Sequence, residues 1–167
     1  MHPTALRVEA EVLQRAGVPD AFARLFIAAR CRATTPFHQA AGRLGEWVGG
    51  AAAHGSCGVG VGETVRQALA APETTLHYGD LVHPAHTLEK LEALRVALHC
   101  EFANVVPSSA DAAQELFVLA DASLAPRWLD AVQPCLRQSP PAGADAIGER
   151  LARQGTVLFE GAQGVLL

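Results

Sequence analysis

A short apolar run followed by a glycine-rich turn, near the end of the chain, constrains the fold most. Val157 to Phe159 is an apolar run of strand length, and Glu160-Gly161-Ala162-Gln163-Gly164 follows it directly. This order is typical of a buried strand that ends in a tight turn, where α/β proteins place ligands. The glycines that flank Gln163 allow close approach to the backbone, and its amide can both donate and accept hydrogen bonds. The alternative interpretation is a glycine-rich turn with an exposed amide.

Composition and charge bound the class of protein. Of 167 residues, 50% are hydrophobic and 18% charged, which excludes a disordered chain and allows one domain with a sizeable core. The formal net charge of −4 gives no basis for binding nucleic acid or an anionic membrane. Neither a membrane-spanning run nor a signal peptide is visible, so we expect a cytoplasmic protein. The cysteines are far apart, which is typical of reduced thiols: Cys31, Cys57, Cys100 and Cys135.

Helical and strand patterns follow one another along the chain. Apolar spacing, together with Pro and Gly near segment ends, predicts helices over about 4–16, 36–47, 64–70, 87–98, 109–120, 126–134 and 145–153. Continuous apolar runs predict buried strands at 23–29 and 156–160, and Gln-Ser-Pro-Pro-Ala-Gly-Ala at 138–144 predicts an internal linker. We therefore expect an α/β chain that is predominantly helical, in which those two strands lie side by side in a small parallel sheet.

A second glycine-rich stretch lies between the second and third predicted helices. Gly55 to Gly62 holds four glycines in eight positions, which disfavours regular helix or strand. Such loops let backbone N–H groups surround an anion, and a helix that begins near Thr64 would add the positive end of its dipole. A flexible surface loop is the alternative. The stretch contains neither a complete G-x-G-x-x-G nor a Walker A pattern.

Three histidines and a carboxylate cluster within ten residues, which raises the question of a metal site. They are His77, Asp80, His83 and His86. Gly79 and Pro84 make the backbone irregular here, so no helical face aligns the four side chains as ligands. We expect solvated loop histidines and predict no metal ligand.

Four stretches of the chain resemble the adenylosuccinate synthetase family. Thr156 to Leu167 is similar to its V-L-F-E-G-A-Q-G-x-L-L, and Gly79-Asp80-Leu81 is similar to part of its R-V-G-D-L. His2-Pro3-Thr4-Ala5-Leu6 and Thr35-Pro36-Phe37-His38-Gln39-Ala40 resemble its [N/H]-P-x-x-L and T-P-x-H-x-A. The resemblance implies a P-loop-NTPase-like synthetase fold and a homodimer. It also implies a ligase of purine biosynthesis that joins inosine monophosphate (IMP) to aspartate, with GTP and Mg²⁺.

The resemblance also implies substrate-binding residues. Ser56-Cys57-Gly58 stands where the family has T-T-G, whose second Thr binds the nucleotide phosphate, and Gln163 stands where the family Gln contacts IMP. Ser56, Cys57, Gly58 and Gln163 are therefore expected to bind IMP. Because a thiol is a weak donor, contact with phosphate is expected to rest on Ser56 and on backbone N–H groups. Arg66 is the candidate for the Arg that the family sends across its dimer.

Two catalytic elements of the family have no counterpart in this sequence. They are the G-D-E-G-K-G-K phosphate loop, which carries the catalytic Asp, and a catalytic His. We therefore predict no catalytic residue, and we expect residues 1–167 to be a single partial domain from the middle of such an enzyme. By itself this domain is expected to bind IMP weakly, to bind neither GTP nor Mg²⁺ fully, and to be inactive. It is expected to associate as a homodimer or with the missing parts of the enzyme. The alternatives are a non-catalytic nucleotide-binding or dimerising module that partners a complete synthetase, and a purely structural helical domain.

Overall fold

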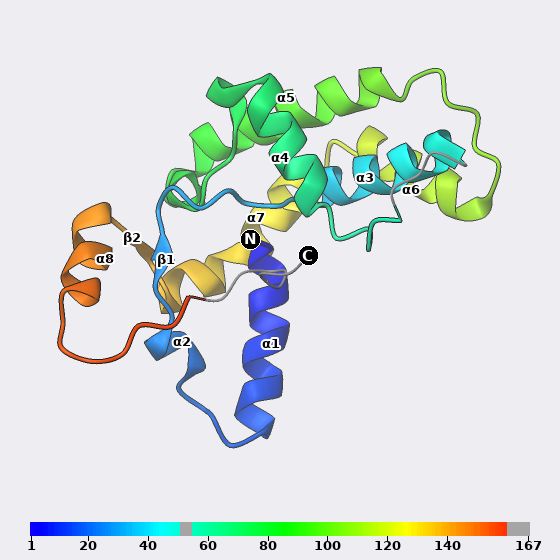
Figure 1. The fold of residues 1–167 in the computed structure, drawn as a ribbon. Helices are drawn as coiled ribbons and strands as arrows, with labels where there is room; N and C mark the ends of the chain where they lie inside the picture. The colour runs from blue at the N-terminus through cyan, green and yellow to red at the C-terminus, as the bar shows by residue number, and fades with distance from the viewer. Residues whose placement is uncertain (51–54, 160–167) are drawn as a thin grey trace.

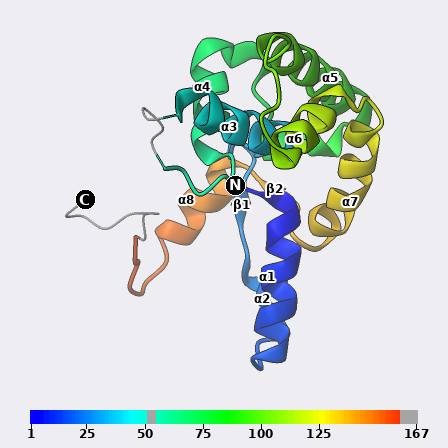
Figure 2. The same ribbon diagram turned by 90° about the vertical axis from the view of Figure 1, so that its right-hand side faces the viewer.

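The computed structural model describes residues 1–50 and 55–159 and is mostly helical. The elements in chain order are α1 Pro3–Arg15, α2 Ala21–Arg24, β1 Ile27–Ala28, α3 Pro36–Gly49, α4 Val61–Ala70, η2 Pro72–Thr74, η3 Tyr78–Val82, α5 Pro84–Glu101, α6 Ala110–Ala120, α7 Leu124–Gln138, β2 Pro141–Ala142 and α8 Ala144–Leu151. Helices α3 to α6 gather at one end of the molecule, and α1 and α2 extend from the other (Figures 1 and 2). No helix in the described ranges is both long and apolar enough to cross a membrane.

The small parallel sheet that the sequence predicts is present, but its second strand is not the predicted one. β1 pairs with β2, with Ile27 opposite Pro141, and the Ala29 N–H donates to the Ala142 carbonyl at 2.8 Å. β2 lies within the segment 138–144 that was predicted as a linker. The prediction of a strand at 156–160 is wrong in its described part, because residues 156–159 are irregular. Phe159 is 90% exposed, so this apolar run finds no partner layer among the described residues.

The first predicted strand is also shorter than expected. Its first two residues lie in α2, and the Arg24 guanidinium donates to the Asp20 carboxylate one turn earlier at 2.8 Å. Only Ile27 and Ala28 remain for pairing with β2. The segment just before β2 is held beside β1 by a side chain, because the Ser139 hydroxyl donates to the Leu25 carbonyl at 2.9 Å.

Helix α3 begins where its sequence signals place it. The Thr35 hydroxyl accepts from the His38 N–H at 3.3 Å, and the Thr35 N–H donates to His38 Nδ1 at 3.1 Å. Pro36 occupies the first turn, where its missing N–H costs nothing. The T-P-x-H motif is thus a reciprocal helix cap. Ala40, Ala41 and Leu44 of this helix face the core.

Two other helices are longer than predicted. α5 begins at Pro84, three residues before the predicted start, because Pro is tolerated in a first helical turn. α7 was expected to end at Pro134 but continues to Gln138. Its buried residues Val132 and Leu136 lie on either side of Pro134 and pack into the core, which offsets the cost of a proline inside the helix.

The hydrophobic core lies among α3, α5, α6, α7 and η3. Its largest fully buried apolar side chains are Phe37, Leu44, Tyr78, Leu81, Leu91, Leu98, Leu119 and Val132. The Tyr78 hydroxyl donates to the Ser139 carbonyl at 2.8 Å and so joins η3 to the segment that leads into β2. In contrast, α1 buries only Pro3 and leaves Val8 and Val12 more than half exposed.

Candidate functional site

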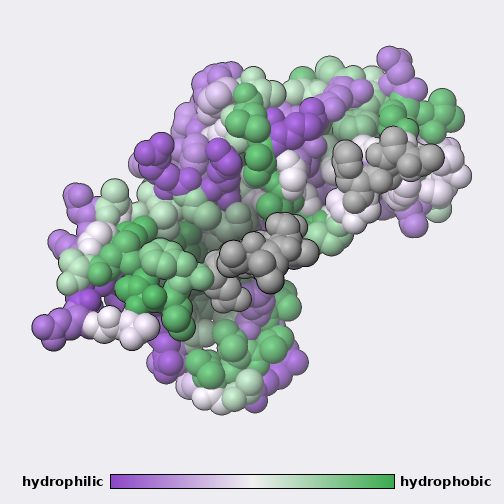
Figure 3. Space-filling model, viewed as in Figure 1, coloured by the Kyte–Doolittle hydropathy of each residue, from purple (hydrophilic) through white to green (hydrophobic). Residues whose placement is uncertain are grey.

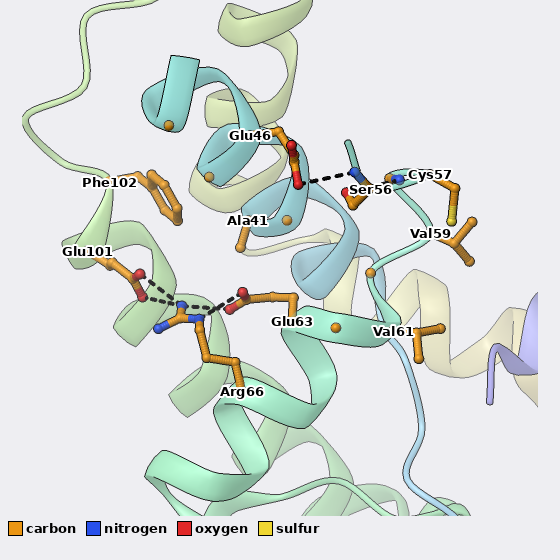
Figure 4. A pocket seen from close by; sticks show the side chains of 16 residues that line it. Ala41, Glu46, Ser56, Cys57, Val59, Val61, Glu63, Arg66, Glu101 and Phe102 are labelled. Carbon is orange, nitrogen blue, oxygen red and sulfur yellow. Dashed lines mark hydrogen bonds and ion pairs between the residues drawn. The ribbon is translucent and has the colours of Figure 1, made fainter. Parts of the chain in front are cut away.

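The glycine-rich loop borders a cavity of about 490 Å³ between α3, α4 and the end of α5. Its lining residues are Ala41, Gly42, Gly45, Glu46 and Gly49 of α3, the stretch Ser56 to Glu63, Arg66 of α4, and Glu101 and Phe102 at the end of α5 (Figure 4). This volume is within the range of pockets that hold small molecules. The predicted loop is therefore one wall of a site whose other walls come from three helices.

Helix α3 holds the loop from two sides. The Glu46 carboxylate accepts from the Gly55 N–H at 3.0 Å and from the Ser56 N–H at 3.2 Å. One turn earlier, the Arg43 guanidinium donates to the Gly58 carbonyl at 3.1 Å, and it also pairs with Glu115 of α6 at 2.6 Å. Two side chains of α3 with opposite charges, Arg43 and Glu46, thus fix the loop backbone. The N–H groups of Gly55 and Ser56 already donate to Glu46 and are not available to a ligand.

Gly60 fixes the point at which the loop enters α4. Its φ of +84° lies in the left-handed region that favours glycine, and a Cβ placed there would lie 2.8 Å from the Gln39 nitrogen of α3. The Thr64 hydroxyl donates to the Gly60 carbonyl at 2.8 Å. The loop therefore rests directly on the backbone of α3, and a side chain at this position is not accommodated.

Arg66 lies between two carboxylates at the floor of the cavity. Its guanidinium donates to Glu63 at 2.7 and 2.8 Å and to Glu101 at 2.8 Å (Figure 4). The hydrogen bonds to Glu63, joined by those to Glu101 and opposed by burial, raise the pKa of Arg66 above its ordinary value. With Glu46 included, the lining carries three carboxylates against one guanidinium. A bound anion would meet net negative charge from these side chains.

The first turn of α4 supplies hydrogen-bond donors beside the cavity. Gly60 is the N-cap and has no side chain to accept from the helix, and no described group accepts from the backbone N–H groups of Val61, Gly62 and Glu63. The N-terminus of a helix favours negative charge for this reason. The side chains of Cys57 and Val59 point away from Arg66 and Glu101 (Figure 4). The Cys57 thiol therefore lines the cavity away from the ion pairs of Arg66.

Comparison with known proteins gives the family. A sequence model of adenylosuccinate synthetase matches residues 1–167, which is the whole chain. The chain belongs to the adenylosuccinate synthetase family. The adenylosuccinate synthetase of Neisseria meningitidis serogroup A is 28% identical over 165 residues, which are 99% of this chain and 36% of that protein. Those of Methylibium petroleiphilum and Acidithiobacillus ferrooxidans are 34% identical over 171 residues and 32% identical over 175 residues, and this chain covers 35% and 36% of them. It thus spans little more than a third of the length of these relatives.

Most of the site residues implied by the synthetase resemblance lie together. Ser56, Cys57, Gly58 and Arg66 all line the one cavity. Gln163 lies outside the described residues, so its expected position beside them stays a prediction. Arg66 is engaged by two carboxylates of its own chain, and its expected role across a synthetase dimer also stays a prediction.

Two other motifs shared with the synthetases have structural roles. Burial lowers the pKa of His38 to about 4, so the imidazole is neutral near pH 7 and acts as the cap of α3. In G-D-L, the Asp80 carboxylate accepts from the His77 N–H at 2.8 Å and from Lys90 at 2.9 Å. Burial raises the pKa of Asp80, but these hydrogen bonds outweigh burial and lower it below its ordinary value. Asp80 therefore stays ionised and holds the start of η3.

Sequence reasoning missed the acidic half of the cavity. Glu46, Glu63 and Glu101 come from three different helices, and their proximity depends on how α3, α4 and α5 pack. The sequence carries no signal for this, since Glu63 and Glu101 are 38 positions apart. Within residues 1–50 and 55–159, no three His, Cys, Asp or Glu side chains gather so that they could hold a metal ion. No step that needs Mg²⁺ is assigned to the described residues.

Proposed function

We propose that this chain contributes the IMP-binding region of an adenylosuccinate synthetase, an enzyme of purine biosynthesis that joins IMP to aspartate with GTP and Mg²⁺. The observation that carries the proposal is the cavity formed by the glycine-rich loop, in a chain that matches the family along its whole length. Ser56, Cys57 and Gly58 would lie against the IMP phosphate, with Gln163 as a further contact.

The donors around the cavity support phosphate as the bound group. The free N–H groups of Val61, Gly62 and Glu63 and the Ser56 hydroxyl can donate to phosphate oxygens without any change in the fold. The carboxylates of Glu46, Glu63 and Glu101 oppose this attraction. Cys57 replaces the family Thr with a weaker donor. These features together predict weak binding of IMP.

We further propose that the 167-residue polypeptide is a partial domain and does not catalyse the ligation alone. Its sequence contains no G-D-E-G-K-G-K stretch to hold and activate a γ-phosphate. Positioning and charge stabilisation of phosphoryl transfer both depend on such groups. Formation of adenylosuccinate by this polypeptide alone, from IMP, aspartate and GTP, would contradict the proposal.

The test of IMP binding is to restore the hydroxyl that the family has at position 57. A hydrogen bond from a hydroxyl to a charged phosphate is worth about 1.5 to 3 kcal/mol, so Cys57→Thr is expected to bind IMP roughly tenfold or more tightly in calorimetry. Cys100→Thr is the matched control, because Cys100 is exposed on α5 and does not line the cavity. It should bind like the unmodified chain. Equal affinities of the two variants would count against IMP at this loop.

A second candidate function is a dimerising module that partners a complete synthetase. The observation that favours it is an apolar stripe along α4, formed by Val61, Val65 and Leu69, which are 55%, 39% and 74% exposed. Figure 3 shows this stripe as a green band that crosses polar surroundings. Contiguous exposed apolar surface is typical of interaction sites. Sedimentation velocity tests this candidate, since a dimer formed through the stripe is dissociated by Leu69→Glu, and a monomeric chain would contradict it.

A further inference from the structure

We propose that the hollow beside β1, lined by Arg30 and Arg32, is a second binding site, which takes a phosphate group. The hollow has a volume of about 400 Å³ and lies across the first turn of α4 from the glycine-rich loop. Its lining residues are Met1, Arg30, Cys31, Arg32, Thr34, Val61, Thr64, Val65 and His77. This site is separate from the proposed IMP cavity, although Val61 borders both.

The charge of this hollow is the opposite of that in the IMP cavity. Two guanidinium groups line it, and among the described residues that line it none is Asp or Glu. Neither Arg30 nor Arg32 has an ion pair or a side-chain hydrogen bond within residues 1–50 and 55–159. In contrast, Arg66 in the neighbouring cavity is taken by two carboxylates. Arg30 and Arg32 therefore keep their donors available for a ligand, in a chain whose net charge is −4.

The backbone that carries these arginines is fixed rather than loose. Arg32 pairs with His77 in an antiparallel bridge, the Ala33 N–H donates to the Leu76 carbonyl at 2.9 Å, and the Tyr78 N–H donates to the Cys31 carbonyl at 2.8 Å. Side chains directly opposite each other in such a pair emerge on the same face. Arg32 and His77 thus form one side of the hollow. The Asp80 carboxylate lies beside His77, but the Lys90 ammonium pairs with it, with 2.9 Å between Lys90 Nζ and Asp80 Oδ2.

The position in the fold also favours a ligand. β1 ends at Ala28, and Arg30 and Arg32 follow it directly, on the connection that passes under the first turn of α4 (Figure 1). Ligands of α/β proteins bind beyond the carboxyl ends of parallel strands. The facing wall is α4, and the Thr64 hydroxyl lies within hydrogen-bond distance of the Thr34 hydroxyl, 3.0 Å away. The hollow thus lies between the residues that follow β1 and the first turn of α4, and the guanidinium groups of Arg30 and Arg32 line it.

Phosphate is the class of ligand that fits these groups. The planar guanidinium donates two parallel hydrogen bonds to phosphate oxygens, and a pair of arginines matches a doubly charged anion. The volume exceeds that of phosphate alone, so the phosphate of a small phosphorylated molecule is accommodated as well as the free ion.

The probe for the test is inorganic pyrophosphate, titrated into the 167-residue chain by calorimetry at low ionic strength. The variant is the double substitution R30Q/R32Q, which is expected to bind at least about tenfold more weakly than the unmodified chain. The matched control is R137Q/R153Q, which removes the same charge from two exposed arginines outside the hollow. This control should bind within about twofold of the unmodified chain, because neither arginine lines the hollow and both are exposed.

Two further variants separate charge from geometry and from folding. R30K/R32K keeps the charge but loses the planar fork, so its affinity should fall between those of the unmodified chain and R30Q/R32Q. The unfolding temperature of R30Q/R32Q should equal that of R137Q/R153Q, since neither pair of side chains makes a hydrogen bond or an ion pair within residues 1–50 and 55–159. Equal weakening by the two Gln variants, or no binding of pyrophosphate by the unmodified chain, would overturn the proposal.

Two phosphate sources are then compared, inorganic phosphate and ribose 5-phosphate. Tighter binding of ribose 5-phosphate, lost in R30Q/R32Q, identifies a phosphorylated small molecule as the ligand. Equal binding of both, also lost in R30Q/R32Q, identifies the phosphate ion itself. If R30Q/R32Q still binds inorganic phosphate or ribose 5-phosphate, the anion binds elsewhere and the proposed site is wrong.

Discussion

Replacing Gly60 by Ala probes how the glycine-rich loop is built. Gly60 is buried at the entry to α4 with a φ of +84°. A Cβ at this position would lie 2.8 Å from the Gln39 nitrogen, and 3.0 Å from both the Gln39 Cα and the His38 carbonyl carbon. These are backbone atoms of α3, so no flexible side chain can move aside to relieve the contact. The substitution must therefore shift the loop away from the helix.

The expected loss of stability has two parts. An alanine held in the left-handed region costs about 1 to 2 kcal/mol relative to glycine. Overpacking against backbone that cannot yield adds about 1 to 3 kcal/mol. We therefore expect Gly60→Ala to lower the free energy of unfolding by about 2 to 5 kcal/mol.

The assay is urea unfolding followed by circular dichroism, with Gly62→Ala as the matched control. Gly62 lies two residues further along in α4, has no positive φ, and a Cβ there would meet nothing within 4 Å. Because alanine favours helix over glycine, the control should be as stable as the unmodified chain or slightly more stable. Equal free energies of unfolding for the two variants would refute the geometry described for the loop.

Two further predictions concern buried polar groups. Burial lowers the pKa of His38 from 6.5 to about 4. Between these pH values His38 is protonated in the unfolded chain but not in the folded chain, so the free energy of unfolding falls as the pH falls. Between pH 7 and pH 4, the free energy of unfolding measured in urea should fall by about 3 kcal/mol more for the unmodified chain than for His38→Gln. Parallel pH profiles of the two proteins would contradict this. Tyr78→Phe removes the hydrogen bond to the buried Ser139 carbonyl and should cost about 1 to 3 kcal/mol, measured as a lower urea midpoint. An unchanged midpoint would mean that this bond does not hold the segment before β2.

The helices were predictable where local chemistry determines them. Pro36 with Thr35 marks the start of α3, and Leu91, Leu94 and Leu98 are buried along α5 as their spacing indicates. These signals act within one or two helical turns, so the sequence carries them in full.

The strands were not predictable in the same way. The first two residues of the apolar run 23–29 lie in α2. β1 pairs with Pro141 and Ala142 rather than with the run at 156–160. A two-residue strand that contains proline has neither a hydrophobic period nor a β propensity to reveal it. Its formation depends on contacts distant in sequence, such as the Tyr78 hydroxyl with the Ser139 carbonyl.

The candidate site was predictable in part, and for the same reason. The glycine spacing of the loop predicted a bend that surrounds a ligand, and this loop does line the cavity. The partners that determine its charge, Glu46 from α3 and Glu101 from α5, reach it only through helix packing. The basic hollow at Arg30 and Arg32 was also invisible in the sequence, because it forms only when α4 packs against the connection between β1 and α3.

The most direct test of the proposed IMP site follows the backbone amides of the loop by ¹H–¹⁵N nuclear magnetic resonance during titration with IMP and, separately, with inosine. A phosphate held at the first turn of α4 predicts that the signals of Val61, Gly62 and Glu63 move with IMP and move far less with inosine. Unchanged signals at these three residues, or equal shifts with both compounds, would contradict an IMP phosphate bound by this loop.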